Sequence, residues 1–112
     1  MLSLDTHILL HALTGDLTRK EMSLISRSPW SISAIVLWEI AKLAQLGRIA
    51  VDVDDAELCR TLAKLHVWPI TWDVCRAIPR LDFQGDPADE IIAATSVVHR
   101  VPLVTRDRAI RR

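Results

Sequence analysis

The chain of 112 residues is 50% hydrophobic and 25% charged, which is the balance of a folded globular protein and excludes an intrinsically disordered one. This length supports one hydrophobic core, so we expect a single domain over residues 1–112. The 14 basic and 14 acidic residues cancel, which gives no global case for nucleic-acid binding, and no apolar run is long enough for a membrane span, so we expect a cytoplasmic protein.

Strands and helices alternate in the N-terminal half. An apolar run at residues 1–4 predicts a buried strand, and Asp5 follows it directly. The carboxyl end of a buried strand is where α/β proteins place their ligands, so Asp5 is a candidate site residue. The elements expected in this half are strands at 1–4 and 30–33 and helices at 8–13, 17–25 and 34–46, the last capped by Ser33.

Glu39 is a carboxylate on the otherwise almost wholly apolar helix at 34–46. At about 100° per residue it projects inside the apolar face of that helix. Its expected neighbours there are Ile35, Leu43 and Leu46. A carboxylate in such a place is costly unless it is paired or bound to a cation. A pair with Lys42, three residues on, is the alternative to a cation site, and the sequence leaves both open.

The alternation continues in the C-terminal half. Pro69 weakens the strand expected at 67–70 or places it at a sheet edge, and Pro79 should kink or end the helix expected from 72 to about 81. The other elements expected here are a helix capped by Asp54 or Asp55 and carrying residues 58–65, a helix from Asp86 to about Arg100, and a strand at 101–105. Thr71 caps the helix from 72. This order predicts a parallel three-layer α/β/α sandwich.

Three aspartates lie in the segment from residue 86 to residue 107. Asp86, followed by proline, marks a helix start, and Asp107 stands just past the strand at 101–105, as Asp5 does past the first strand. Asp86 as an N-cap and Asp89 as a first-turn acid that complements the helix dipole would be an ordinary structural arrangement. The similar placement of Asp5 favours a site instead.

The cysteines, histidines and tryptophans give weaker evidence about function than the acids do. Cys59 and Cys75 have apolar neighbours and no paired spacing, so we expect reduced core thiols. The histidines lack metal-ligand spacing and are expected to be structural or at the surface: His7, His11, His66 and His99. The sequence has four tryptophans, which is many for a chain of this composition, and for each one alone a place in the core is the better expectation. The first three helices, however, carry more apolar surface than the sheet can cover, so we expect this surface to associate with another protein chain. These are Trp30, Trp38, Trp68 and Trp72.

Several segments together resemble the PIN-domain family and, within it, the VapC-like toxin nucleases of toxin–antitoxin pairs. They read LDTHILLHAL, SISAIVLWEIAKLAQLGRI, WPITWDVCRAI and DPADEIIAATSVVHRVPLVTRD, and they span nearly the whole chain. The resemblance implies a PIN-like fold, a metal-dependent ribonuclease acting on RNA, a homodimer, and an antitoxin that lies over the site. It implies four metal-binding acids with a neighbouring hydroxyl: Asp5, Glu39, Asp89, Asp107 and Thr105.

The sequence also departs from the family pattern. Glu90 and Gly85 stand where other residue types are usual, and Pro79 interrupts a helix that is normally smooth. Family members usually continue past the segment TRD into one more strand, whereas this sequence stops at Arg112, so whether the last edge strand is missing or replaced stays open.

Oxygen-only ligands select hard cations, Mg²⁺ or Mn²⁺, which neutralise clustered carboxylates and activate water. A non-catalytic PIN-like binding module that has kept its acids is the main alternative. A receiver or phosphatase domain is a weaker one, because Asp5 lacks a second Asp two residues on.

Overall fold

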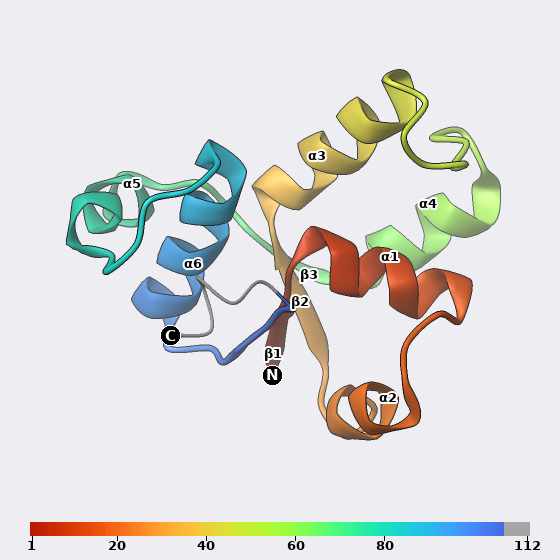
Figure 1. Ribbon diagram of the computed structural model, residues 1–112, viewed down its shortest axis with the longest axis horizontal. Coiled ribbons are helices and arrows are strands. Elements are labelled where there is room, and N and C mark those ends of the chain that lie inside the picture. Colours follow the sequence, from red (N-terminus) through yellow and green to blue (C-terminus); the bar gives the residue numbers. More distant parts are fainter. Residues whose placement is uncertain (107–112) are drawn as a thin grey trace.

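The structure, a computed structural model, describes residues 1–106, and in this range the strands form one parallel sheet (Figure 1). The strands are β1 (Leu2–Leu4), β2 (Trp30–Ser33), β3 (His66–Trp68) and β4 (Leu103–Val104), in the order β3-β2-β1-β4. Ser3 of β1 stands opposite Ser31 on one side and Leu103 on the other. All the pairings are parallel, so these strands end at the same edge of the sheet, as expected.

Helices cover both faces of the sheet, which confirms the three-layer sandwich. Figure 1 shows α5 and α6 on one side and α1, α2 and α4 on the other, while α3 packs against α1, α6 and β2. The helices are α1 (Thr6–Thr14), α2 (Arg19–Ile25), α3 (Ala34–Gln45), α4 (Ala56–Ala63), α5 (Trp72–Ala77) and α6 (Pro87–His99), with a 3₁₀ turn η1 (Ile78–Arg80) after α5. No helix in this range is both long and apolar enough to cross a membrane.

One hydrophobic core joins the central strands to four of the helices. Its fully buried side chains come from β1, α1, α2, β2, α3 and α6, and each contributes about 1.5–3 kcal/mol through the burial of apolar surface. They include Leu4, Ile8, Leu9, Ile25, Ile32, Val36 and Ile92. Because this core holds β1 and α3 firmly, the residues at their ends are placed with little freedom.

Three helix starts match the predicted caps, whereas α1 begins at Thr6, directly after its N-cap Asp5, and not at residue 8 as expected. The side chains of Ser33, Asp55 and Thr71 each accept a hydrogen bond from the first turn of the helix that they cap, as expected. Thr18 and Glu21 form a capping box at the start of α2 that the sequence reasoning missed, although the T-x-x-E spacing is its known pattern.

Prolines set the ends of two elements. β3 covers His66–Trp68 and not 67–70, because Pro69 has no N–H to donate to a neighbouring strand, and β3 does lie at the edge of the sheet. Pro79 ends α5 and stands in η1, as expected. β4 is shorter than the predicted strand at 101–105.

The prediction that both cysteines are core residues was wrong for Cys59, which is exposed on α4, a helix that buries no residue completely. Cys75 is half-buried, and both thiols are free.

Candidate active site

Asp5 stands at the carboxyl end of β1 and is also the N-cap of α1. Its Oδ1 accepts a hydrogen bond from the backbone N–H of Ile8 at 2.8 Å, and its Oδ2 accepts one from the hydroxyl of Thr105. The residue is only 7% exposed, so these bonds offset the cost of burying a carboxylate. Thr105 follows β4, the neighbour of β1, and the contact therefore joins two adjacent strand ends.

Glu39 joins the same region through Thr6, the first residue of α1, whose hydroxyl donates to Glu39 Oε1. Glu39 is half-buried, and Lys42 donates instead to Gln45 at 2.8 Å, so the structure does not show the alternative pair with Lys42. The expectation that Leu46 flanks Glu39 in the apolar face was wrong, because Leu46 lies past the end of α3 and is 53% exposed.

Two carboxylates and two hydroxyls thus form a polar group at the carboxyl edge of the sheet, which we call the edge cluster. Its members are Asp5, Thr6, Glu39 and Thr105. Three separate parts of the chain meet there: the β1–α1 junction, α3 and the end of β4. The sequence placed Asp5 and Thr105 at strand ends, whereas the link through Thr6 was not foreseen.

Asp89 is half-buried in the first turn of α6, the helix that packs against α3 and β2. Asp86 is the N-cap of α6, as predicted, but its side chain makes no capping hydrogen bond. Asp107 lies outside the described residues. Within residues 1–106 no three carboxylate, imidazole or thiol side chains are grouped so that they could hold a metal ion, so the four-acid metal site stays a prediction.

An ion pair lies beside this cluster. Arg106 follows Thr105, and its guanidinium donates from Nε to Glu21 Oε2 at 2.7 Å and from Nη2 to Glu21 Oε1 at 2.6 Å. Hydrogen bonds from Arg106, and then from the capping box with Thr18, lower the pKa of Glu21 to about 2, and the Glu21 carboxylate in turn raises the pKa of Arg106. The sequence reasoning missed this pair because 85 positions separate its two members.

Two histidines pack against an indole ring. The rings of His66 and His99 both lie 4.1 Å, between centroids, from Trp68, His99 in a stacked and His66 in an edge arrangement. This agrees with the expected structural role of these histidines.

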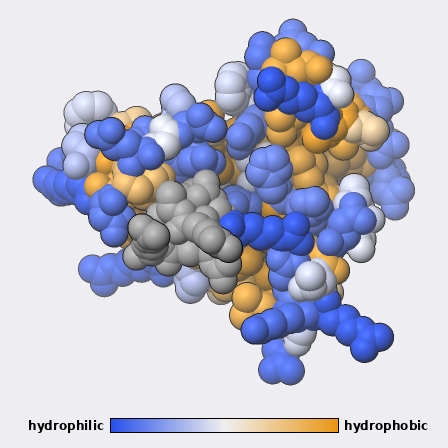
Figure 2. Space-filling view, viewed as in Figure 1, coloured by the Kyte–Doolittle hydropathy of each residue, from blue (hydrophilic) through white to orange (hydrophobic). Residues whose placement is uncertain are grey.

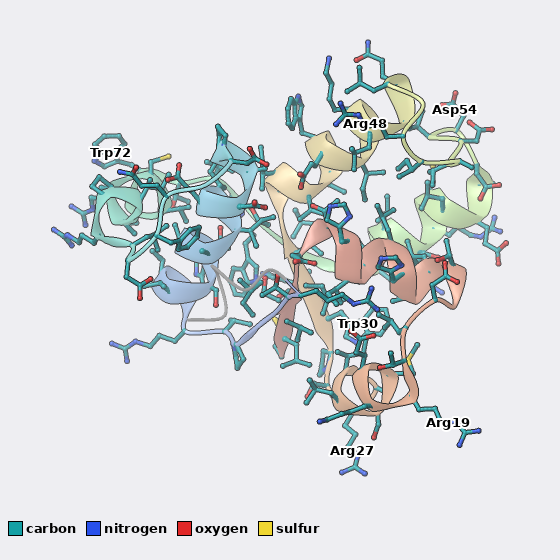
Figure 3. All side chains as sticks on the ribbon, viewed as in Figure 1. Arg19, Arg27, Trp30, Arg48, Asp54 and Trp72 are labelled. Carbon is teal, nitrogen blue, oxygen red and sulfur yellow. The ribbon has the colours of Figure 1, made fainter. Side chains whose placement is uncertain are left out.

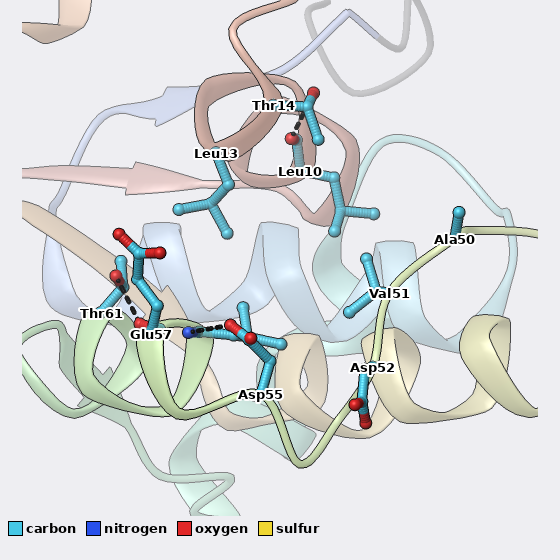
Figure 4. A pocket seen from close by; sticks show the side chains of 10 residues that line it. Leu10, Leu13, Thr14, Ala50, Val51, Asp52, Asp55, Glu57 and Thr61 are labelled. Atoms are coloured by element: carbon cyan, nitrogen blue, oxygen red, sulfur yellow. Dashed lines mark hydrogen bonds between the residues drawn. The ribbon is translucent and has the colours of Figure 1, made fainter.

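A groove of about 450 Å³ lies between α1, α4 and the segment that joins α3 to α4 (Figure 4). Its apolar lining includes Leu10, Leu13, Val51 and Leu58, and its acids are Asp52, Asp55 and Glu57. Figure 2 shows hydrophobic surface between the helices on this side of the molecule. The groove is separate from the edge cluster, since no member of the cluster lines it.

Comparisons with known proteins place this fold in a family. The PIN domain model matches residues 2–112. Ribonuclease VapC22 from Mycobacterium tuberculosis is 34% identical over 85 residues, which cover 72% of this chain and 65% of that relative, so the match spans slightly less than two thirds of the relative's length.

Solved structures show the same architecture at low identity. A toxin–antitoxin complex from Klebsiella pneumoniae matches with a TM-score of 0.73 and 22% identity, covering 96% of this chain and 87% of that one. VapBC2 from Rickettsia felis bound to a promoter DNA fragment matches with a TM-score of 0.72 and 17% identity, covering 98% of this chain and 90% of that one. FitAcB from Neisseria gonorrhoeae matches with a TM-score of 0.68 and 18% identity, covering 98% of this chain and 90% of that one. With the parallel sheet and with a family match that spans nearly the whole sequence, the chain belongs to the PIN domain family.

Proposed function

We propose that this protein is a metal-dependent endoribonuclease that hydrolyses RNA phosphodiester bonds and that it is the toxin of a toxin–antitoxin pair. The observation that carries the proposal is the edge cluster, where Asp5 and Glu39 are brought to one edge of the sheet and oriented by hydroxyl groups. Similarity to a relative named as a ribonuclease supports RNA as the substrate.

The donor chemistry fits a hard divalent cation, since carboxylate and hydroxyl oxygens are the ligands that Mg²⁺ and Mn²⁺ prefer. Asp5, Glu39, Asp89 and Asp107 would hold the ion, and Thr105 would stand beside it. When bound, such an ion activates a water molecule and stabilises the charge that develops on the phosphodiester. The hydrogen bonds of Ile8 and Thr105 to Asp5 fix the carboxylate before substrate binds, so it needs little reorganisation during the reaction.

The rival function is a non-catalytic binding module. Such a module would bind RNA or a partner without cleaving anything.

Cleavage of RNA separates the two functions. Purified protein is incubated with total RNA and Mg²⁺ or Mn²⁺, with EDTA as the metal control. Asp5→Asn should reduce cleavage by about 100-fold or more while keeping the fold, because Asn is as good an N-cap as Asp. Asp54→Asn is the matched control, since Asp54 is exposed in the α3–α4 connection (Figure 3) and should leave cleavage unchanged. RNA binding without metal-dependent cleavage would support the binding module.

The toxin assignment adds a protein partner and a cellular place. The structural neighbour from Klebsiella pneumoniae is a toxin–antitoxin complex, which supports an antitoxin partner here, and we expect that partner to lie over the edge cluster. We place the activity in the cytoplasm, where RNA is abundant. The cleavage assay gains one arm, in which the protein encoded beside this one is added. Cleavage should then fall, and undiminished cleavage in the complex would contradict the antitoxin proposal.

A further inference from the structure

The ion pair between Glu21 and Arg106 stands beside the edge cluster without belonging to it. We propose that Arg106 binds a backbone phosphate of the RNA substrate and that Glu21 is the positioning residue that holds its guanidinium ready. This proposal rests on the ribonuclease function above and names two residues outside the four acids.

The place of Arg106 is the first argument. It follows Thr105, whose hydroxyl reaches Asp5, and its side chain is 41% exposed, so it lies at the rim of the cluster and is open to solvent. The bond between Thr105 and Asp5 places the next residue, Arg106, directly beside the acids of the edge cluster. A phosphate approaching these acids is repelled by them, and a cation at the rim offsets that repulsion.

The hydrogen-bonding capacity of the guanidinium is the second argument. Glu21 engages Nε and Nη2, while Nη1 and the second proton of Nη2 take no part in this pair. A guanidinium held by a carboxylate on one side can still donate to a phosphate oxygen on another, in the planar geometry that makes Arg a preferred phosphate ligand.

The third argument concerns how firmly Glu21 is held. Its Oε1 also accepts from the backbone N–H of Thr18 at 2.9 Å, and its own N–H donates to the Thr18 hydroxyl at 3.1 Å. The carboxylate is therefore fixed to the start of α2 before it meets Arg106. Because a long side chain loses rotamer freedom when it binds, a guanidinium that is already oriented binds a phosphate at a smaller entropic cost.

Two variants separate positioning from charge. Glu21→Gln removes the negative charge but keeps the capping box, in which Gln serves as well as Glu. Arg106→Gln removes the proposed phosphate ligand. Arg27→Gln is the matched control for loss of a basic residue, because Arg27 extends away from the molecule at the end of α2 (Figure 3). Thermal melts check that each variant is folded.

The readouts are kcat and KM for a fluorescent single-stranded RNA oligonucleotide. Its binding is also measured by fluorescence anisotropy across salt concentrations, with each variant carried in an Asp5→Asn background. Arg106→Gln should raise KM about tenfold with little change in kcat, as expected for a lost charged hydrogen bond. It should also reduce the salt slope of binding by about 0.7, the value for one phosphate contact to a single strand. Arg27→Gln should do neither.

The direction of the Glu21→Gln effect is decisive. If Glu21 positions Arg106, KM rises severalfold even though the protein becomes more positive. Tighter RNA binding by Glu21→Gln would mean that the carboxylate acts only by its charge and would overturn the positioning role. An unchanged KM and salt slope in Arg106→Gln would overturn the phosphate site. If the wild type binds RNA without cleaving it, the nuclease proposal fails, while the anisotropy measurements still test whether Arg106 binds a phosphate and whether Glu21 positions it.

Discussion

At the scale of the residue, the edge cluster depends on side chains that serve structure and site together. Asp5 caps α1 with one oxygen and receives the Thr105 hydroxyl on the other, so the same bonds that start a helix also orient a carboxylate. Thr6 uses its hydroxyl to hold Glu39, which stands on a different helix. Substitutions at these positions therefore need to preserve hydrogen bonding if their effects on catalysis are to be read.

Glu39→Gln meets that condition. The amide oxygen of Gln can still accept from Thr6, and the loss of one charge reduces repulsion with Asp5, so the melting temperature measured without metal should stay the same or rise. Cleavage of RNA should fall by about 100-fold or more if Glu39 is a metal ligand. Lys42→Gln is the control and should alter neither, because Lys42 donates its hydrogen bond to Gln45 and not to Glu39. A marked loss of stability in Glu39→Gln would instead identify Glu39 as a structural ion-pair partner.

At the scale of the element, local chemistry explains why much of the fold was predictable. Ser33, Asp55 and Thr71 are residue types that accept hydrogen bonds from helix starts, and Pro79 cannot continue a helix, so these boundaries follow from nearby residues alone. Asp5 could be placed in the same way, from the apolar run before it.

Contacts over long sequence separation were not predictable by that route. The Thr6–Glu39 and Glu21–Arg106 contacts join residues 33 and 85 positions apart, and they depend on how helices and strands pack rather than on local pattern. The prediction for Cys59 failed for a related reason: Cys59 stands between Leu58 and Arg60 in the sequence, and the packing of α4 leaves Cys59 exposed while Leu58 is half-buried.

The end of α6 offers a test at this scale. Arg100 has a φ of 54°, a left-handed conformation that costs a non-glycine residue about 1 kcal/mol, whereas Gly15 adopts a φ of 77° at the end of α1. Arg100→Gly should therefore raise the free energy of unfolding by about 1 kcal/mol, and Gly15→Ala should lower it by a similar amount although nothing lies within 4 Å of the added Cβ. Urea unfolding measures both, and opposite signs to these would show that packing at the two ends outweighs backbone conformation.

At the scale of the whole molecule, the tryptophans fall into two groups. Trp30 donates to the carbonyl of Ile25 at 2.8 Å and Trp68 stacks on His99, and both are half-buried. Trp38 is 58% exposed on α3 and Trp72 is 76% exposed at the start of α5 (Figure 3). Large exposed aromatic side chains are typical of interfaces, which supports the homodimer that we expect from the family resemblance.

Light scattering should accordingly find a dimer at micromolar concentration, and Trp38→Ala should shift it toward monomer because an interface aromatic is lost. Val53→Ala is the control, since Val53 is also exposed but lies in the connection between α3 and α4, outside the first three helices. A monomeric wild type, or a dimer that Trp38→Ala leaves intact, would contradict the assignment of this surface.

The pairing of β4 with β1 also sets the order in which the molecule is completed during translation. β1 emerges from the ribosome first and can pair with β2 as soon as residues 30–33 follow, but its other side has no partner until residues 103–104 have been made. The carboxylate of Asp5 therefore lacks the hydroxyl of Thr105 until one hundred further residues have been made. A nascent chain cannot complete the edge cluster before Thr105 has been made, so a protein proposed to cut RNA acquires its complete site only after the ribosome has translated that part of its own message.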